Sequence, residues 1–329
     1  ANPDAVVILE HFVDDENYEL GNRGMKVWRN MNNAYCQAAM GYQSESDFGG
    51  LADCTYEWAA FGSYVGFMES HDEERMQYHA RKSGVGNIKT DENVRRNRVA
   101  ANVVFNVLLA GPHMIWQYEE IGYDFSINSS DEKPDEYNTD NRCSKKPSPY
   151  TLGYFESETR MKQYTQIAQI IQLRTKLLPE VFEGNPTVAN ITGSRELRTV
   201  QWGSDVCLVG NFSAVYDQTA TVPEGTWYNY FTQQLQPAGD VTLKPGEMLL
   251  LTGKQLQLPN VNTDVENVFM PENTMDLLPP YNATIYTVSG QAVSVQYNVN
   301  QVNMSGLNDG LYLIQLEKNG QRVTKKVIR

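Results

Sequence analysis

The fold of this 329-residue chain is indicated most clearly by the stretch Tyr64-Val65-Gly66-Phe67-Met68-Glu69-Ser70-His71-Asp72-Glu73-Glu74-Arg75. The stretch begins as a short apolar run, which is typical of a buried β-strand, and ends in histidine, acidic and arginine residues. Ionisable side chains at the end of a buried strand cost free energy unless they have partners or a use. We therefore expect this strand end to be part of a functional site or of a network of ion pairs.

Two other apolar runs also end in acidic residues. Residues 5–12 read Ala-Val-Val-Ile-Leu-Glu-His-Phe, and the run His113–Tyr118 is followed directly by two glutamates. Between the second and third runs, residues 91–110 have apolar positions at helical spacing, with Asp91 or Thr90 before them as an N-cap. Continuous apolar strands that alternate with helices predict a parallel sheet that is covered on both faces.

Residues 1–179 therefore repeat a unit of strand, polar strand end, loop and helix, which is the pattern of a (β/α)8 barrel. An intact barrel has eight such units and needs about 250 residues. Only about half a barrel is present, and its first strand run begins almost at Ala1, so we expect the chain to be part of a longer one. A polar loop over residues 126–149 is either mobile or functional.

The pattern changes after Pro179. Short strands over residues 197–202, 206–212, 218–222, 226–232 and 241–251, separated by glycine, proline and aspartate turns, predict an antiparallel β-sandwich over residues 180–255. Residues 256–280 read as a linker, and residues 281–329 as a small β-sandwich tail with a hairpin turn at Asn319-Gly320. The predicted class is thus α/β plus all-β.

Composition and charge exclude several classes of partner. With 40 acidic and 27 basic residues the net charge is −13, which argues against nucleic acid, because phosphate binding needs a basic face. No apolar run approaches the ~20 residues needed to span a bilayer. The four cysteines lack zinc-ligand spacing, so no metal site is expected; Cys36 and Cys54 either form a disulfide or, as we favour, are two buried free thiols.

Three acidic strand ends, at Glu10, Asp72 and Glu119-Glu120, would meet at one edge of the predicted sheet. Paired carboxylates that face one cleft suit hydrolysis of a glycosidic bond, in which one carboxyl protonates the leaving oxygen and its partner stays ionised. Glu10 is the better acid, because its apolar neighbours in the strand would raise its pKa. The alternative is that each acid pairs with an arginine or caps the next helix.

Two further residues belong to these strand ends. His71 is suited to be a metal ligand, a base or a hydrogen-bond donor to a substrate, or it is structural. Trp116 either stacks on a sugar ring or belongs to the core.

Three segments together resemble a known family. Phe67 to Asp72 is similar to the Phe-x-x-x-His-Asp motif on the seventh barrel strand of the α-amylase family, glycoside hydrolase family 13. Glu10 then resembles the general acid of the fifth strand, and residues 111–122 resemble the eighth-strand segment that ends in an acid, an apolar residue and glycine. The resemblance implies a partial (β/α)8 barrel of strands 5–8, followed by the family's β-sandwich domain.

The resemblance also implies roles in a retaining hydrolysis of α-1,4-glucans. Glu10 would be the acid/base, Asp72 would stabilise the transition state and bind sugar hydroxyls, and His71 would donate to the same sugar. Glu120 and Trp116 are expected at the substrate-binding end of the eighth strand. No cofactor is expected in this chain, and a structural calcium would belong to the missing N-terminal half of the barrel.

The sequence departs from the family in two ways. The family's nucleophile is an aspartate two residues after an arginine, and no Arg-x-Asp occurs in this chain. Gln117-Tyr118 stands where many members have Tyr-Gly. We therefore expect the chain to be inactive alone and to need the missing half as a partner. An α-glucan branching or transglycosylating enzyme, and a non-catalytic glucan-binding or structural fragment, are the alternatives.

The tail resembles the C-terminal sorting module of proteins that bacteria of the Bacteroidota export through the type IX system. The resembling segments are residues 286–291, residues 307–314 and the basic end at Lys325-Lys326-Val327. The resemblance implies a secreted or cell-surface bacterial protein. The alternative is an ordinary accessory β-sandwich, with carbohydrate binding as one use.

Overall fold

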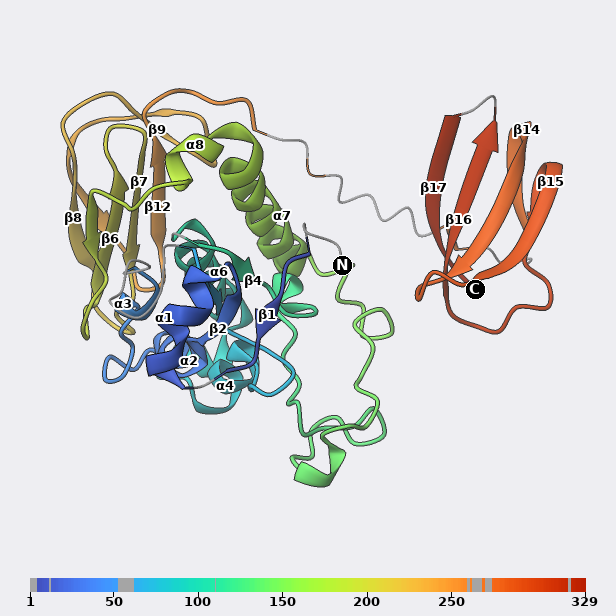
Figure 1. The fold of residues 1–329 in the computed structure, drawn as a ribbon, viewed down its shortest axis with the longest axis horizontal. Coiled ribbons are helices and arrows are strands. Elements are labelled where there is room, and N and C mark those ends of the chain that lie inside the picture. Colours follow the sequence, from blue (N-terminus) through green and yellow to red (C-terminus); the bar gives the residue numbers. More distant parts are fainter. Residues whose placement is uncertain are drawn as a thin grey trace. The chain divides into compact units, whose positions relative to one another are not determined.

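The computed structural model of the protein describes residues 5–11, 13–52, 62–109, 111–258, 261, 268–269, 274–318 and 321–329. The chain forms two compact units, Ala1–Val261 and Asn262–Arg329 (Figure 1). In the described parts of the chain, no helix has both the length and the apolar composition that a membrane span requires.

The first unit contains a four-stranded parallel sheet whose spatial order is the chain order. Parallel neighbours need crossover connections, and helices provide them here. The strands are β1 (Ile8–Leu9), β2 (Lys26–Asn30), β3 (Tyr64–Phe67) and β4 (His113–Met114). The helices between them are α1 (Asp14–Asn22), α2 (Asn32–Met40), α3 (Gly49–Ala52), α4 (Met76–Ser83), α5 (Asn87–Thr90) and α6 (Glu92–Leu108).

Strand β3 is buried along its whole length, as its apolar run predicts. The prediction of a buried strand over residues 5–12 is wrong in the described residues, because β1 spans two residues and the side chains before it are exposed, Val6 at 75% and Val7 at 46%. The reason is position: β1 is an outer strand of the sheet and pairs only with β2 in the part of the chain that the structure describes.

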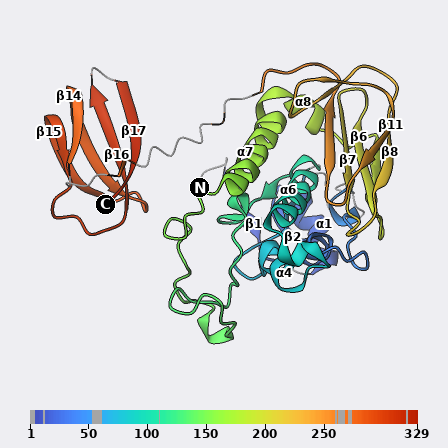
Figure 2. The ribbon, with the colours of Figure 1, turned by 180° about the vertical axis from the view of Figure 1, so that it is seen from behind.

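Helix α6 forms as its pattern predicts. The Asp91 side chain accepts hydrogen bonds from the backbone N–H of Asn93 at 2.8 Å and of Val94 at 3.3 Å, which is an N-cap. Helix α7 (Glu158–Gln172) packs against α6, continues as a π-helical segment over Leu173–Leu177, and is followed by α8 (Pro179–Phe182). Figure 2 shows the two long helices from behind.

The sequence of residues 51–61 also has helical character, and the structure describes only part of this stretch. Its beginning lies in α3, and residues 53–61, with Cys54, lie outside the described residues. Cys36 is a buried free thiol.

The β-rich part of the first unit is antiparallel, as predicted. One sheet has the order β10-β9-β12-β7-β6-β5 and a second pairs β11 with β8. The strands are β5 (Val188–Asn190), β6 (Leu197–Trp202), β7 (Val206–Asn211), β8 (Gln218–Val222), β9 (Trp227–Asn229), β10 (Leu235–Gln236), β11 (Gly239–Leu243) and β12 (Met248–Thr252). The predicted strand 241–251 is two strands, because Pro245 cannot donate to a ladder and Gly246 turns the chain at φ +80°.

The helical layer and the β-sandwich share one core. Phe48 stacks on Tyr35 at 4.0 Å between ring centroids and meets Phe212, beyond β7, edge-on at 5.3 Å. Phe105 of α6 also meets Phe212, at 5.2 Å. The division predicted at residue 179 therefore runs through a continuous core and lies inside one compact unit.

Arg98 of α6 fixes this junction. Its side chain is 2% exposed and donates hydrogen bonds to the carbonyls of Ala38 and Ala39 in α2, at 2.7 and 3.2 Å. The same guanidinium donates to the carbonyls of Phe212 and Ser213, each at 2.9 Å. Burial lowers the pKa of Arg98 to about 10, so the group stays charged at neutral pH.

The second unit contains one five-stranded sheet in the order β13-β17-β16-β14-β15. Its strands are β13 (Val268–Phe269), β14 (Thr274–Thr287), β15 (Ala292–Asn303), β16 (Leu311–Lys318) and β17 (Gln321–Ile328). A small sandwich was expected; in the described residues two long strands with shifts in register replace separate short ones. β14 begins inside the stretch predicted as linker. β16 and β17 pair antiparallel, up to Lys318 with Gln321, and the predicted turn residues Asn319-Gly320 lie outside the described residues.

We expect Arg98→Ala to lower the free energy of unfolding of the first unit by at least about 3 kcal/mol, because several buried carbonyls lose a charged donor. Urea denaturation followed by tryptophan fluorescence measures it, since all five tryptophans lie in this unit. Arg195→Ala is the matched control: among the described residues that exposed side chain donates only to the Thr192 carbonyl, and we expect a change of about 0.5 kcal/mol or less. Equal losses in the two variants would contradict the role of Arg98.

Candidate functional site

A cavity of about 100 Å³ lies at the carboxyl ends of the parallel strands. All four strand ends contribute to its wall, and catalytic groups in α/β folds gather at this end of the sheet. The lining residues include Glu10 after β1, Trp28 and Asn30 of β2, His71 and Asp72 after β3, and Trp116 after β4. We call this cavity the cleft.

Glu10, His71 and Asp72 meet in the cleft. Each of the three side chains is exposed, and one oxygen or nitrogen from each lies within 4.8 Å of those of the other two. His71 Nε2 is 3.4 Å from Asp72 Oδ2, and the ring centroids of His71 and Trp116 are 6.1 Å apart. Four of the five residues selected from the sequence thus line one cleft. Two carboxylates and an imidazole at this separation also suit a divalent cation, although no metal was expected.

Glu10 lies at the end of β1, as the sequence predicts, but the strand around it is not buried as predicted. Its side chain is exposed, Ile8 is 41% exposed, and Leu9 is half-buried. The strand neighbours from which its role as the acid was argued therefore do not bury it, because among the described residues β1 pairs only with β2 and its other edge has no partner strand.

The turn after β3 is held by polar side chains that the sequence reasoning missed. Ser70 Oγ accepts hydrogen bonds from the backbone N–H of Asp72 and Glu73, at 3.0 and 3.1 Å. The amide of Asn32 donates to the carbonyls of Met68 and Glu74, at 2.7 and 2.8 Å. A signal was available in the sequence, since Asn32 lies two residues after the end of β2.

Arg142, from the loop of residues 126–149, also reaches the cleft. Its guanidinium forms a close ion pair with Asp72 Oδ1 and donates to the His71 carbonyl at 3.3 Å. Lys146 holds this loop by donating to the carbonyls of Ser129, Asn141 and Arg142, at 2.7, 2.6 and 3.1 Å. Two expectations for Asp72 are therefore met together. It pairs with an arginine, as expected of a structural acid, and it lines the cleft, as expected of a functional one.

Glu69 is a structural acid behind the cleft. It is 1% exposed, its Oε2 lies 3.1 Å from Arg75 Nη1, and its Oε1 accepts the Met76 N–H at 2.8 Å. Burial raises its pKa, and Arg75 opposes the shift. Arg75 also donates to the carbonyl of Gln117 at 2.7 Å, so it joins the ends of β3 and β4.

Glu119 and Glu120 do not line the cleft, in contrast to the expectation of three converging acids. β4 ends at Met114, and Tyr118 then turns the chain at φ +65°, a left-handed conformation that residues other than glycine rarely adopt. Glu119 is 1% exposed, and its Oε2 accepts the backbone N–H of Trp116 at 2.9 Å. Glu119 thus supports a cleft residue from behind.

The pKa values of both glutamates are raised. Burial, followed by repulsion from Glu69, raises the pKa of Glu119 well above its usual value. Burial also raises the pKa of Glu120, which is half-buried.

Solved structures with the same fold identify the architecture. AmyP in complex with maltose matches with a TM-score of 0.53 and 14% identity, over 70% of this chain and 50% of that chain. Pullulanase type I from Bacillus subtilis, complexed with maltose, has a TM-score of 0.55 and 11% identity, over 76% of this chain and 40% of that chain.

The γ-CGTase from the alkalophilic Bacillus clarkii matches with a TM-score of 0.51 and 12% identity, over 99% of this chain and 49% of that chain. This is the fold of the α-amylase family. At such identities the likeness establishes the fold alone. The chain spans about half the length of these amylase-type structures.

The C-terminal resemblance is confirmed independently. Residues 259–329 match the family described as the secretion system C-terminal sorting domain. The match begins inside the stretch predicted as linker and includes every strand of the second unit. No curated protein matches the chain.

We expect Glu119→Gln to stabilise the protein more at pH 7 than at pH 4. Folding raises the pKa of the Glu119 carboxyl, so the folded state binds that proton more tightly than the unfolded state does. As pH rises above the unfolded pKa of 4.5, the carboxyl of the unfolded state ionises freely, and the folded state loses stability relative to it. Glutamine can still accept from the Trp116 N–H but does not ionise. Urea denaturation at the two pH values measures the difference, with the exposed Glu224→Gln as control. A constant difference between wild type and Glu119→Gln would refute the assignment.

Proposed function

We propose that residues 1–261 provide half of the active site of a retaining α-glucan hydrolase, with β1–β4 as strands 5–8 of its (β/α)8 barrel. The observation that carries the proposal is the meeting of Glu10, His71 and Asp72 at adjacent strand ends. It is supported by the shared fold, since AmyP and the Bacillus subtilis pullulanase were solved with maltose.

In this function Glu10 protonates the leaving glycosidic oxygen and later accepts the proton of the attacking water. Asp72 binds sugar hydroxyls and stabilises the positive charge that develops on the sugar ring. His71 donates a hydrogen bond to the same sugar, and Trp116 offers its ring for stacking. The exposure of Glu10 in this chain indicates that the acid acquires its apolar surroundings from another part of the barrel.

The nucleophile has to come from the missing half. Retaining hydrolysis needs a second carboxylate about 5 Å from the acid, and the chain has no Arg-x-Asp motif to supply it. The outer strands β1 and β4 are where such a half would pair to close a barrel. An apolar cavity of about 450 Å³ beside β4, lined by residues that include Val107, Pro112 and Ile171, adds surface to bury there.

A non-catalytic glucan-binding fragment is the second candidate, and the missing Arg-x-Asp motif favours it for the chain as it stands. An α-glucan transferase would use the same groups, with an acceptor sugar in place of water.

The sorting domain indicates where the protein is exported. Because residues 259–329 match a secretion sorting domain, we propose type IX export of a bacterial protein to the cell surface or the medium. A soluble polymer such as starch or glycogen is accessible to an enzyme there.

We expect the isolated chain to release no reducing sugar from soluble starch, yet to bind maltotetraose in the cleft. Binding should quench tryptophan fluorescence, because Trp28 and Trp116 line the cleft. Asp72→Asn should weaken this binding by about tenfold, since it removes a charged hydrogen-bond acceptor. Arg195→Ala, far in sequence and exposed, is the control. If the chain releases sugar and Glu10→Gln abolishes that release, the prediction of inactivity is wrong. If Asp72→Asn binds maltotetraose as tightly as the wild type, the cleft is not the binding site.

We expect the secreted mature protein to lack the sorting domain. Mass spectrometry of the intact protein from the culture medium or the cell surface measures this, with the cell-retained form as reference. A mature form that keeps residues up to Arg329 would instead identify the second unit as an accessory domain.

A further inference from the structure

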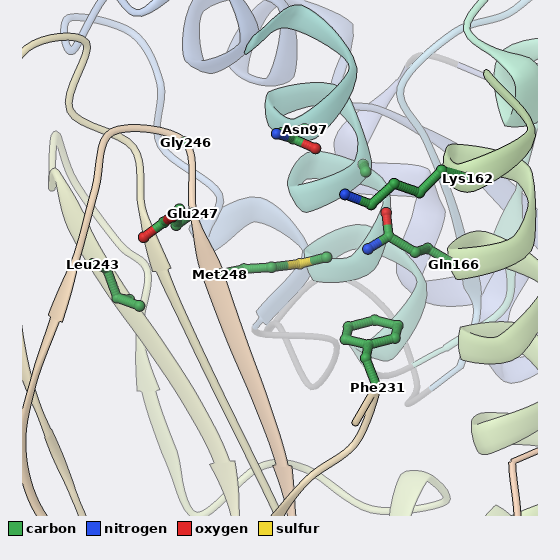
Figure 3. Close-up of a pocket in the computed structure, with 9 residues that line it drawn as sticks. Asn97, Lys162, Gln166, Phe231, Leu243, Gly246, Glu247 and Met248 are labelled. Carbon is green, nitrogen blue, oxygen red and sulfur yellow. The ribbon is translucent and has the colours of Figure 1, made fainter. Parts of the chain in front are cut away.

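The cleft is small for the ligand that the proposed function gives it. It encloses about 100 Å³, less than half the volume of about 240 Å³ in the cavity between the helices and the β-sandwich of the first unit (Figure 3). Pockets that enclose drug-sized ligands measure roughly 300–1,000 Å³. The space at the strand ends is therefore too small, as it stands, to enclose a sugar chain.

The chain itself already engages Asp72. Arg142 forms a close ion pair with Asp72 Oδ1 and donates to the His71 carbonyl at 3.3 Å, and His71 Nε2 lies 3.4 Å from Asp72 Oδ2. The guanidinium thus lies at the rim of the cleft, against the two residues to which the proposed function assigns sugar binding. We call the loop of residues 126–149, which carries Arg142, the strap.

The strap is fixed at both ends. Near its beginning, Glu74 of the turn after β3 accepts hydrogen bonds from Ser126 Oγ at 2.6 Å and from the backbone N–H of Ile127 at 3.0 Å. Near its other end, the Pro147 carbonyl accepts from the Tyr123 hydroxyl at 2.7 Å. The strap is therefore anchored to the turn that also carries the acid it contacts.

The backbone at Arg142 is fixed as well, whereas its side chain is held by exposed contacts. The backbone N–H donates to the Thr139 carbonyl at 3.2 Å, and the carbonyl accepts from Lys146 Nζ at 3.1 Å. The side chains of Arg142 and Asp72 are both partly exposed, and an ion pair of this kind changes an equilibrium constant by no more than about fivefold. A ligand that binds Asp72 can therefore displace the guanidinium.

We propose that the strap is autoinhibitory: Arg142 occupies Asp72 in the empty cleft, and an α-glucan has to displace it to reach that carboxylate. The proposal rests on the proposed function, from which it takes the sugar-binding role of Asp72. Rotation of the Arg142 side chain about its own bonds is sufficient, because the backbone around it stays anchored. The affinity for the glucan is then reduced by the factor that the ion pair contributes.

The first arm of the test measures affinity. Arg142→Ala removes the guanidinium but keeps the backbone carbonyl that Lys146 binds, so the strap stays in place. We expect the full chain with Arg142→Ala to bind maltotetraose about threefold more tightly than the wild type, as measured by quenching of tryptophan fluorescence. Arg142→Lys, which keeps the charge, should stay within about twofold of the wild type. In the Asp72→Asn background, Arg142→Ala should give no gain, because the ion pair is already absent.

The second arm measures the contact itself. Trypsin cleaves after an arginine only when that side chain enters its specificity pocket, so Arg142 has to leave Asp72 before the bond to Cys143 is cut. We expect Asp72→Asn, and saturating maltotetraose on the wild type, each to speed this cleavage about threefold, as followed by mass spectrometry of the full chain. Glu136→Gln is the matched control: it breaks another exposed ion pair of the strap, with Lys133 at 3.0 Å, and should leave the rate unchanged.

The two arms separate the strap from the proposed function. If Arg142→Ala binds maltotetraose as tightly as the wild type or more weakly, the strap is not autoinhibitory and the proposed function stands. If Asp72→Asn leaves the cleavage rate unchanged, the ion pair is not populated in solution and the proposal is overturned. If neither the wild type nor Arg142→Ala binds maltotetraose, the proposed function fails, and the inhibitory role fails with it.

Discussion

The first unit depends on one buried cation. Arg98 has no carboxylate within ion-pair distance among the described residues; four main-chain carbonyls from α2 and from the segment beyond β7 receive its donors instead. A charge in the interior is tolerated only when its hydrogen bonds are satisfied, so these segments have to remain where they are. The orientation of α6, which leads directly into β4 and the cleft, follows from this constraint.

Local signals in the sequence were sufficient for much of the fold. The cap at Asp91 and the apolar spacing after it predict α6, and the bounds of β6 and β8 are those expected from their strand runs. The same signals failed at β1, where an apolar run is exposed. A strand is buried only when other strands and helices pack against it. A run of valine and isoleucine does not show whether the chain itself supplies those elements.

The candidate site was predictable to the extent that it follows from strand direction. Glu10, His71 and Asp72 converge because the carboxyl ends of parallel strands share an edge. Arg142 was not predictable, since it reaches Asp72 from 70 residues away through a loop without periodicity. Glu119 and Glu120 were wrongly expected in the cleft. β4 ends early, at Met114, and the chain turns at Tyr118, and neither feature is evident in the sequence.

The ion pair between Arg142 and Asp72 makes the cleft sensitive to dissolved salt. Both side chains are partly exposed, at 38% and 55%, so counterions reach them and weaken their attraction as ionic strength rises. In the proposed function, a sugar hydroxyl that binds Asp72 would compete with that guanidinium for the same carboxylate. The apparent affinity of the cleft is therefore set partly by the medium, and a protein exported from the cell meets a medium whose salt content the cell does not control.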